Sequence, residues 1–501
     1  KLQDIPISNL PDHYIFKLIL TRWRRQVEEQ INELRGKARI EAKLQEDQAR
    51  FDDRVGLWLY VHNTGSSSAD ELKITLLEGS SFTVIGQRTF MRETMVPGDD
   101  AIFEFILKPE KSLLDLRFEI TYNDEIVYSD EIIYGDGEKP KKVVHVADQL
   151  ELIESYREYV YVPNPYSTGT PMHDQEMFYG REKDMHYLQD NLIRKRKTVV
   201  VLYGQRRTGK TTVLLQLINT NAFGEHVPVL IDLQAISYNM SIQSFLYRVA
   251  NFIYKAMKER DLVICEPKIE DFHNDPMLGF DRFLDTVEER LEGRKLIWLV
   301  DEFEVLEDQV DKRKLEPEIF QYLRNIVQHQ QSINILFSGT HQITEYTRLY
   351  HSVFFNIADH YRLSKISQEG AVALITKPVE SYLEYEPLAV TKIRQLADDQ
   401  PYLIHLLCRA IVDYCNENRK PYVTINDVNV VLNKVMSNGQ YHFSWLWDQV
   451  GTEEHIALSA LAQGSKEDGR WLTLFEINEI YQEYHICLLY TSPSPRDRQK
   501  S

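Results

Sequence analysis

A glycine-rich loop is the segment of this sequence whose residue types and spacing best fit a chemical task. It has the pattern G-x-x-x-x-G-K-T, in which Gly204 and Gly209 are the glycines and Lys210 and Thr211 close the motif. The glycines let backbone N–H groups turn toward phosphate oxygens at a helix N-terminus, which already favours negative charge. We expect Lys210 to reach the β- and γ-phosphates of a nucleotide and the Thr211 hydroxyl to coordinate Mg²⁺. The other phosphate-binding candidates are Gln205, Arg206, Arg207, Thr208 and Thr212.

An acidic pair downstream supplies the second half of this chemistry. Asp301 and Glu302 directly follow the apolar run 296–300, which predicts a central strand of a parallel sheet. Ligands of such sheets bind at the carboxyl ends of the strands. Asp301 is predicted to hold Mg²⁺ through water, and Glu302 to orient and deprotonate the attacking water. Taken alone, the pair fits two solvated carboxylates equally well; the loop upstream favours ATP hydrolysis.

The elements that must position these residues are visible in the hydrophobic pattern. Residues 199–203 predict a strand before the loop, and 213–218 predict a helix after it. Further strands are predicted at 227–233 and 333–341. The last strand ends on polar side chains, one of which is expected to sense the γ-phosphate or the lytic water. Thr340 is our choice, with Ser338 and His341 as rivals, and a hydroxyl that caps the next helix as the equal alternative.

Composition limits the class of protein and its partners. Lysine and arginine number 58 against 76 acidic residues, a net charge of −18. This argues against a general nucleic-acid-binding surface without excluding one basic face, so DNA is an unlikely partner. No apolar stretch reaches membrane-spanning length, and we predict no membrane partner. The 4 cysteines have no metal-site spacing and are typical of a reduced, cytoplasmic protein.

The part before the loop has a different character. A heptad-like stripe at Val27, Ile31, Leu34 and Ala38 predicts a long helix, either a coiled coil or a connector. From residue 51 the apolar residues alternate and turn signals divide the runs, which predicts a small immunoglobulin-like β-sandwich. We find no catalytic constellation there and expect an interaction or spacer module.

Both ends of the sequence look cut. The first residue is Lys1, and the tail 487–501 resembles a translated sequencing adapter, with a genuine Ser/Pro-rich tail as the alternative. The predicted organisation is multidomain, an α/β P-loop core with a helical lid and a partial winged helix, preceded by a helix and an all-β sandwich. The ranges are 1–50 for the helix, 51–138 for the sandwich, 139–178 for a linker, 179–363 for the core, 364–440 for the lid, 441–486 for the truncated winged helix and 487–501 for the adapter artefact.

Several motifs in fixed order resemble a known group. N-P-Y-x-x-G-x-P begins at Asn164 and F-x-G-R-E at Phe178; G-x-R-R-x-G-K-T and the hydrophobic D-E strand follow. This order resembles bacterial and archaeal STAND-type P-loop ATPases, signal-transduction ATPases related to AAA+ and origin-recognition ATPases. The resemblance implies that Phe178, Gly180 and Arg181 lie over the adenine and ribose of ATP. From the residues alone, the segment is a loop before a helix N-terminus.

The lid is identified in the same way. Residues 400–407 resemble the family's G-x-P-x-x-hydrophobic lid motif, which implies that Pro401 lies at the nucleotide. Asp399 stands where relatives tend to carry glycine, which puts this contact in doubt. Pro401 also fits the first position of a helix on its own merits.

The function that follows is a nucleotide-controlled switch. The resemblance implies slow ATP hydrolysis and self-association in the ATP state, with an arginine supplied by a partner. The candidates for that arginine are Arg324, Arg348 and Arg362. A protein partner is expected to bind through the sandwich or the missing termini. The alternatives are a DNA-linked AAA+ ATPase, such as an origin- or transposition-type loader, and a scaffold with a dead site.

Overall fold

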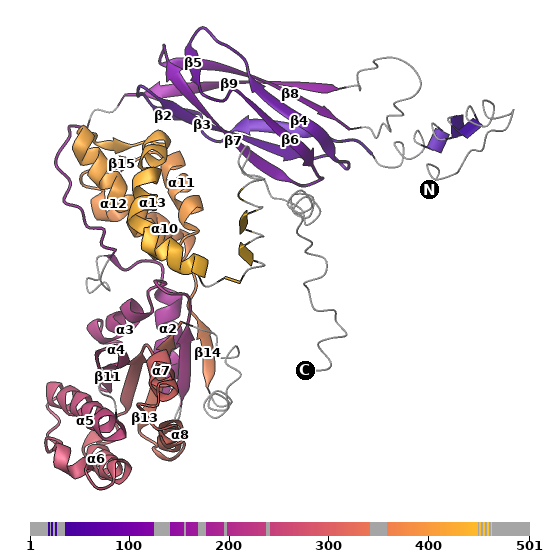
Figure 1. Ribbon diagram of the computed structural model, residues 1–501. Coiled ribbons are helices and arrows are strands. Elements are labelled where there is room, and N and C mark those ends of the chain that lie inside the picture. The colour runs from indigo at the N-terminus through magenta and orange to yellow at the C-terminus, as the bar shows by residue number, and fades with distance from the viewer. Residues whose placement is uncertain are drawn as a thin grey trace. The chain divides into compact units, whose positions relative to one another are not determined.

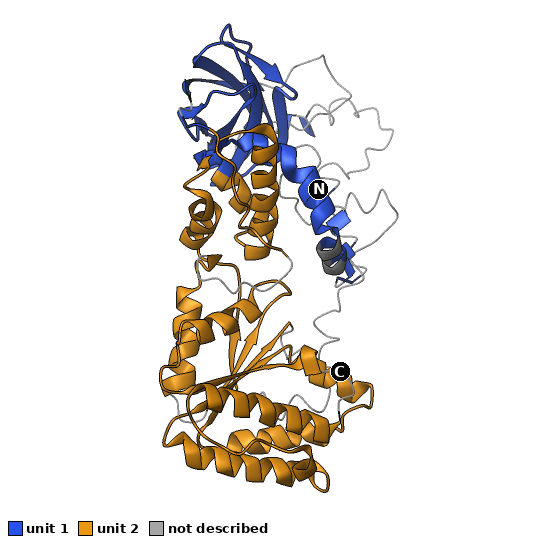
Figure 2. Ribbon diagram, turned by 90° about the vertical axis from the view of Figure 1, so that its left-hand side faces the viewer, with its two compact units in different colours: residues 1–158, 385–389, 422–501 blue, residues 159–384, 390–421 orange. Residues whose placement is uncertain are grey.

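The computed structural model divides the chain into two compact units (Figure 2). Unit 1 comprises residues 1–158, 385–389 and 422–501, and unit 2 comprises 159–384 and 390–421. The structure describes residues 36–124, 141–154, 157–168, 177–194, 198–236, 241–340, 358–448 and 450–451, with single positions in 19–27 and 454–462. The two units are described separately below.

Unit 1 contains two β-sheets that share one hydrophobic core (Figure 1). One sheet has the strand order β1-β3-β7-β5 and the other β2-β9-β8-β4-β6. Alternate apolar residues of both sheets, such as Leu59 and Phe118, are fully buried between them. The strands are β1 (Ile40–Leu44), β2 (Gln48–Arg50), β3 (Val55–Asn63), β4 (Ala69–Leu76), β5 (Phe82–Ile85), β6 (Thr89–Met95), β7 (Asp100–Pro109), β8 (Leu113–Asn123) and β9 (Lys142–Ile153).

The limits of this β-domain differ from the predicted 51–138. Strands β1 and β2 lie inside the range 1–50, for which a helix is predicted, and β9 lies inside the predicted linker 139–178. Sequence analysis overlooked an alternation of apolar and polar residues that is typical of a strand. In β1 this alternation places Ile40 and Leu44 on the same, buried face. Ala38, the end of the predicted helical stripe, immediately precedes this strand. Single positions in 19–27 are helical, whereas Ile31 and Leu34 lie outside the described residues.

A second, smaller core joins segments of unit 1 that are distant in sequence. Trp58 of β3 packs with Leu388 and Ile425, and all three are buried. The buried carboxylate of Glu386 accepts hydrogen bonds from the backbone N–H of Arg50 at 2.9 Å and of Ile425 at 3.2 Å. Unit 1 is therefore more than the sandwich, because residues 385–389 and the helix that begins at Ile425 pack on it.

That helix, α13 (Ile425–Asp448), corrects another boundary. It runs without a break across residues 440 and 441, where we predicted that the lid ends and a winged helix begins. The Asn438-Gly439 pair just before this boundary is a turn signal in the sequence, but both residues are helical in α13, and the helix continues. Most of the predicted winged helix and the whole predicted adapter lie outside the described residues. The short strands β15 (Glu384–Tyr385) and β16 (Tyr422–Val423) lie where the chain passes between the units.

Unit 2 is built on a parallel sheet with the strand order β11-β12-β13-β10-β14 (Figure 1). The strands are β10 (Val199–Tyr203), β11 (Val227–Asp232), β12 (Leu296–Asp301), β13 (Ile333–Gly339) and β14 (Asp359–Arg362). Four of them match the predicted strands. The fifth, β14, was not predicted, because its sequence Asp-His-Tyr-Arg contains no apolar run.

Helices cover both faces of this sheet, and alternate strand residues point to each. Trp298 and Phe337 lie in one core with α5 to α8, whereas Leu299 and Leu336 lie in the other with α2 and α3. The helices are α2 (Glu182–Arg194), α3 (Lys210–Asn219), α4 (Leu233–Ile236), α5 (Ile242–Glu259), η2 (Ile269–Phe272), α6 (Pro276–Leu291), α7 (Glu304–Asp311) and α8 (Glu318–His329). This arrangement is the predicted α/β core, with the carboxyl ends of β10 and β12 at one edge.

The lid helices of unit 2 are α10 (Gln368–Thr376), η4 (Lys377–Val379), α11 (Pro387–Ala397) and α12 (Pro401–Asn418). The first residues of α11 belong to unit 1. The N-P-Y segment is anchored on this lid, since Asn164 donates to Asp413 at 2.8 Å and the Tyr166 hydroxyl to the Ile375 carbonyl at 2.7 Å. This part of the predicted linker is thus a fixed element. In the described part of the chain, no helix has the length and apolar character needed to cross a membrane.

Candidate functional site

The glycine-rich loop connects β10 to α3, as its sequence predicts. Gly209 has a φ of 93°, a left-handed conformation that glycine adopts without steric cost, and it precedes the first turn of α3. The Lys210 ammonium donates to the carbonyls of Gly204 at 2.9 Å and Gln205 at 3.1 Å. Lys210 is buried, and burial lowers its pKa, while the Glu302 carboxylate acts in the opposite direction. The loop residues from Arg206 to Thr212 line a pocket of about 540 Å³.

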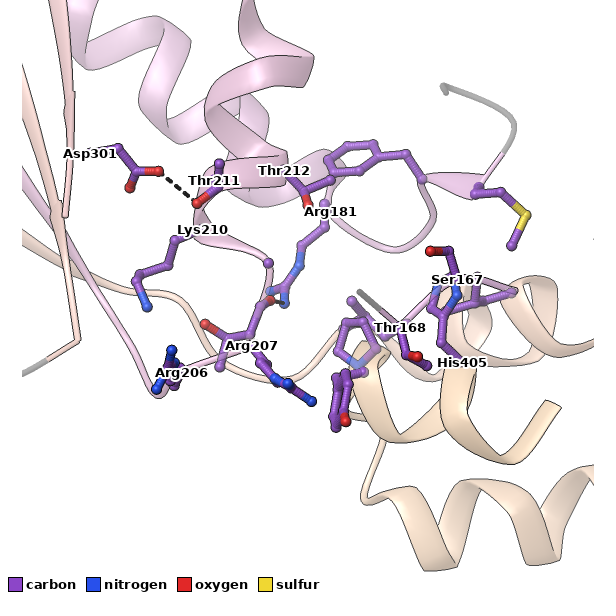
Figure 3. A pocket seen from close by; sticks show the side chains of 18 of the residues that line it. Ser167, Thr168, Arg181, Arg206, Arg207, Lys210, Thr211, Thr212, Asp301 and His405 are labelled. Atoms are coloured by element: carbon purple, nitrogen blue, oxygen red, sulfur yellow. Dashed lines mark hydrogen bonds between the residues drawn. The ribbon is translucent and has the colours of Figure 1, made fainter. Parts of the chain in front are cut away.

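The acidic pair meets the loop at the end of β12. The Thr211 hydroxyl donates to the Asp301 carboxylate at 2.6 Å, which joins the two predicted metal ligands (Figure 3). A hydroxyl and a carboxylate are hard oxygen donors of the kind that Mg²⁺ accepts, so the residues present fit this ion. Both predicted ligands also line the pocket.

Glu302 lies beside them in an unusual environment. Its φ of 54° is in the left-handed region, which costs a non-glycine residue about 1–2 kcal/mol. Burial, followed by the charges of Glu304 and Asp301, raises the pKa of Glu302 to about 7. A carboxyl group with such a pKa is suited to accept a proton from water near neutral pH.

The structure adds a third carboxylate that sequence analysis missed. Glu304, the first residue of α7, accepts hydrogen bonds from the Thr340 hydroxyl at 2.8 Å and from the Thr340 N–H at 3.2 Å. Its carboxylate also contributes to the raised pKa of Glu302. Thr340 thus lies at the end of β13, as predicted, but contacts Glu304 and does not line the pocket. The spacing Asp-Glu-Phe-Glu was a signal that could have revealed Glu304.

The other sensor candidates are less suitably placed. Ser338 is fully buried within β13, and His341 lies outside the described residues. Among the candidate arginines, Arg324 lies on α8, Arg362 is exposed at the end of β14, and Arg348 lies outside the described residues. Neither Arg324 nor Arg362 lines the pocket.

The F-x-G-R-E segment contributes residues to the pocket, but Arg181 contacts the phosphate loop, which the resemblance did not imply. Phe178 and Arg181 both line it. The buried guanidinium of Arg181 donates to the Thr208 carbonyl at 2.8 Å and to Asp184 at 3.1 Å. Burial lowers the pKa of Arg181, and the Asp184 carboxylate opposes this shift. Arg181 therefore holds the phosphate loop, while Gly180 lies behind the pocket against α10.

The lid closes the opposite end of the pocket. Pro401 lines it from the first turn of α12, as predicted, together with Tyr402 and His405, which were not singled out from the sequence. The Arg207 guanidinium lies 4.2 Å from the centre of the Tyr402 ring, so the phosphate loop contacts the lid directly. Asp399, which stands where the family tends to carry glycine, does not line the pocket and pairs with Arg394 at 2.9 Å.

Comparison with protein families agrees with this geometry. Residues 178–407 match a family described as an ATPase domain predominantly from Archaea. The matched segment contains the loop, the acidic pair and the first turns of α12. This part of the chain is a P-loop ATPase domain, whereas the narrower STAND assignment is not confirmed.

Several solved structures resemble the chain, with low sequence identity and low TM-scores. A Walker-type ATPase of Pyrococcus abyssi is 16% identical, with 66% of this chain and 90% of that one covered and a TM-score of 0.46. The Aeropyrum pernix ORC1 protein in complex with DNA is 16% identical (64% and 81% covered, TM-score 0.36), and Cdc6p from Pyrobaculum aerophilum is 14% identical (64% and 84%, TM-score 0.34). Likeness of this degree decides nothing about function. No curated protein matches the chain.

Proposed function

We propose that unit 2 binds ATP with Mg²⁺ in the described pocket and hydrolyses it. The observation that carries the proposal is that three structural elements line one cavity. These are the phosphate loop, the carboxyl end of β12 and the N-terminal turns of α12. The Thr211–Asp301 hydrogen bond joins the first two, and the Arg207–Tyr402 contact joins the first to the third.

Each residue has a definite task in this proposal. Lys210 and the N–H groups of the loop bind the phosphates, and the N-terminus of α3 adds a favourable dipole. Thr211 and Asp301 would hold Mg²⁺, which neutralises phosphate charge when it is bound. Glu302 orients the attacking water and accepts its proton. Arg181 fixes the loop through the Thr208 carbonyl.

Removal of the lysine tests the binding site. Lys210→Ala should abolish binding of a fluorescent ATP analogue, because the variant lacks the cation at the phosphates. Lys255→Ala, which alters an exposed lysine on α5, is the matched control and should bind normally. Equal affinity of the Lys210→Ala variant and the parent protein would refute the assignment.

A second variant separates binding from hydrolysis. Glu302→Gln retains the shape of the side chain and its capacity to hydrogen-bond but lacks the base. It should bind ATP with the parent's affinity and release phosphate at least 100-fold more slowly, the range typical of a lost general base. Phosphate release at the parental rate would show that another group activates the water.

The role served by hydrolysis is a finer proposal, and two candidates remain. In the signal-transduction switch, ATP draws the core and lid of unit 2 together and promotes self-association. In the DNA-linked ATPase, the same cycle loads or releases a DNA partner. Of the solved structures named above, one holds the ORC1 protein in complex with DNA. We keep the DNA-linked role level with the switch, despite the net charge of −18.

One experiment on the protein distinguishes these roles. Duplex-DNA binding is measured from 50 to 200 mM salt with ATP, and assembly state is followed by light scattering. Binding through phosphate contacts weakens steeply with salt. Tight, salt-sensitive DNA binding without assembly would establish the DNA-linked role. ATP-dependent assembly with weak DNA binding would establish the switch.

A further inference from the structure

The pocket has two chemically different ends. Lys210, Thr211 and Asp301 gather at one end, and Ser167, Thr168 and His405 gather at the other (Figure 3). The pocket lining also includes the apolar residues Met177, Phe178, Ile366 and Leu374. A nucleotide with its phosphates at the charged end would extend its base toward Ser167, Thr168 and His405.

His405 is the most unusual polar residue of that end. Its side chain is only 6% exposed, yet it lines the pocket from α12. Its Nδ1 atom is buried and has no hydrogen-bond partner among the residues that the structure describes. Leaving a buried polar atom unpaired is costly, so such an atom in a residue that lines a cavity points to a ligand.

The surroundings of His405 fix the ring in place. The Tyr166 ring packs edge-to-face against it, with centroids 5.7 Å apart. Tyr166 is itself held by the carbonyls of Leu374 and Ile375. The N-P-Y segment therefore positions His405 as well as bringing Ser167 and Thr168 to the pocket. Burial lowers the pKa of His405 to about 4, so its imidazole is neutral at physiological pH.

We propose that His405 is a specificity-determining residue that hydrogen-bonds the base of the nucleotide through Nδ1, selecting the 6-amino group of adenine. The inference rests on the proposed ATP binding and adds the group that recognises the base. A neutral imidazole with its proton on Nε2 presents Nδ1 as an acceptor. Adenine carries a donor amino group at C6, where guanine carries an acceptor oxygen. GTP would therefore leave Nδ1 unsatisfied in this tautomer.

The test compares ATP with purine riboside triphosphate, an analogue that lacks only the 6-amino group. Affinities are measured by calorimetry without turnover. The parent protein should bind ATP about 5- to 10-fold more tightly than the analogue, which is the usual effect of one hydrogen bond. His405→Phe keeps an aromatic ring against Tyr166 but has no nitrogen, so it should bind both nucleotides equally.

Two further variants separate recognition from folding. His405→Asn keeps a hydrogen-bonding atom at the same number of bonds from the backbone as Nδ1 and should retain part of the preference for ATP. His186→Asn alters an exposed histidine of α2 and should leave the preference unchanged. Thermal melting of each variant confirms that unit 2 is folded.

The outcomes distinguish this inference from the function on which it rests. If the parent binds ATP but His405→Phe discriminates between ATP and the analogue as the parent does, then His405 does not read the base and ATP binding still stands. A parent protein that binds ATP and the analogue equally also overturns the inference. A parent protein that binds no nucleotide overturns both proposals.

Discussion

At the scale of single residues, the end of β12 concentrates like charges that a stable fold would avoid. Asp301, Glu302 and Glu304 are close enough to raise the pKa of Glu302, and Glu302 also has a left-handed backbone. Strain and charge repulsion of this kind persist mainly at functional sites, where the surrounding structure enforces them. Glu304 is a positioning residue in this arrangement, because it hydrogen-bonds Thr340 and its charge helps to raise the pKa of Glu302.

We predict that Glu304→Ala lowers the rate of ATP hydrolysis about 10-fold or more, while ATP affinity changes less than 2-fold. The variant frees Thr340 and removes the neighbour that orients Glu302, but it leaves the phosphate loop intact. Thr340→Val should cause a smaller loss of the same kind. If the two residues act together, the double variant will be no slower than Glu304→Ala, which a mutant cycle of hydrolysis rates measures. Fully additive losses would show that the contact is incidental.

The buried imidazole of His405 gives a prediction on stability and pH. Its pKa falls from 6.5 to about 4 on folding, so above pH 6.5 both the folded and the unfolded chain are neutral at this site. Between pH 6.5 and 4 only the unfolded chain takes up the proton, and the free energy of unfolding therefore falls. At pH 5 this amounts to about 2 kcal/mol, since one pKa unit corresponds to about 1.4 kcal/mol.

Chemical denaturation of unit 2 in the parent and in His405→Phe, between pH 7.5 and 4.5, checks this prediction. From pH 7.5 to pH 5 the free energy of unfolding of the parent should fall by about 2 kcal/mol relative to that of His405→Phe, because the variant has no imidazole to protonate. Parallel curves would show that His405 titrates normally in the folded protein.

At the scale of elements, two backbones approach so closely that only glycine fits. A Cβ on Gly370 of α10 would lie 2.3 Å from the Cα of Gly180, in the loop that carries Phe178 and Arg181. The Gly180 carbonyl also accepts a hydrogen bond from the N–H of Ser367, which caps α10. This contact ties the loop of the core to the first turn of a lid helix within unit 2.

Gly370→Ala should therefore separate the loop from α10 and weaken ATP binding at least 10-fold. The methyl group meets backbone atoms, which cannot move aside as a flexible side chain would. Glu369→Ala, an exposed change in the same turn, is the control and should bind ATP like the parent. Binding titrations accompanied by circular dichroism of both variants decide the matter. Normal affinity in Gly370→Ala would show that the loop adjusts.

The elements also show how far the sequence alone predicts this structure. The phosphate loop, β12 and the acidic pair were predicted, because continuous apolar runs and fixed motif spacing are local signals. Strand β14 and the anchoring of Tyr166 on the lid depend on partners distant in sequence, so no local pattern reveals them. His405 lies within the predicted lid segment, but the sequence does not show that its Nδ1 atom is buried without a hydrogen-bond partner. That becomes apparent only when the positions of Tyr166 and the pocket are known. The immunoglobulin-like type of the sandwich and the winged helix stay predictions.

At the scale of the whole molecule, the division into units does not follow the order of the chain. The chain passes between the units after Glu158, Glu384, Ala389 and Pro421. Residues that sequence analysis assigned to the lid, including Leu388 and Ile425, thus contribute to the small core around Trp58. The buried Glu386 carboxylate adds two backbone hydrogen bonds to the same junction.

Trp58→Ala should lower the stability of unit 1 by about 3–5 kcal/mol, the usual cost of removing a large buried aromatic side chain. It removes the surface on which Leu388 and Ile425 pack, and unfolding of unit 1 can be followed by urea denaturation. Met91→Ala changes a residue that is 60% exposed and should cost less than about 0.5 kcal/mol. Equal effects of the two substitutions would contradict the assignment of this small core.

The discontinuous make-up of unit 1 has a consequence for how such a protein can change by recombination. A crossover at residue 158 that replaced the sandwich alone would leave Leu388 and Ile425 facing an unrelated surface and would deprive Glu386 of the Arg50 N–H. A new sandwich could therefore be accepted only with matching residues at 385–389 and at the start of α13. In proteins descended from one ancestral gene, we therefore expect the sandwich, residues 385–389 and the start of α13 to change together. The order of the residues along the chain does not by itself reveal this dependence.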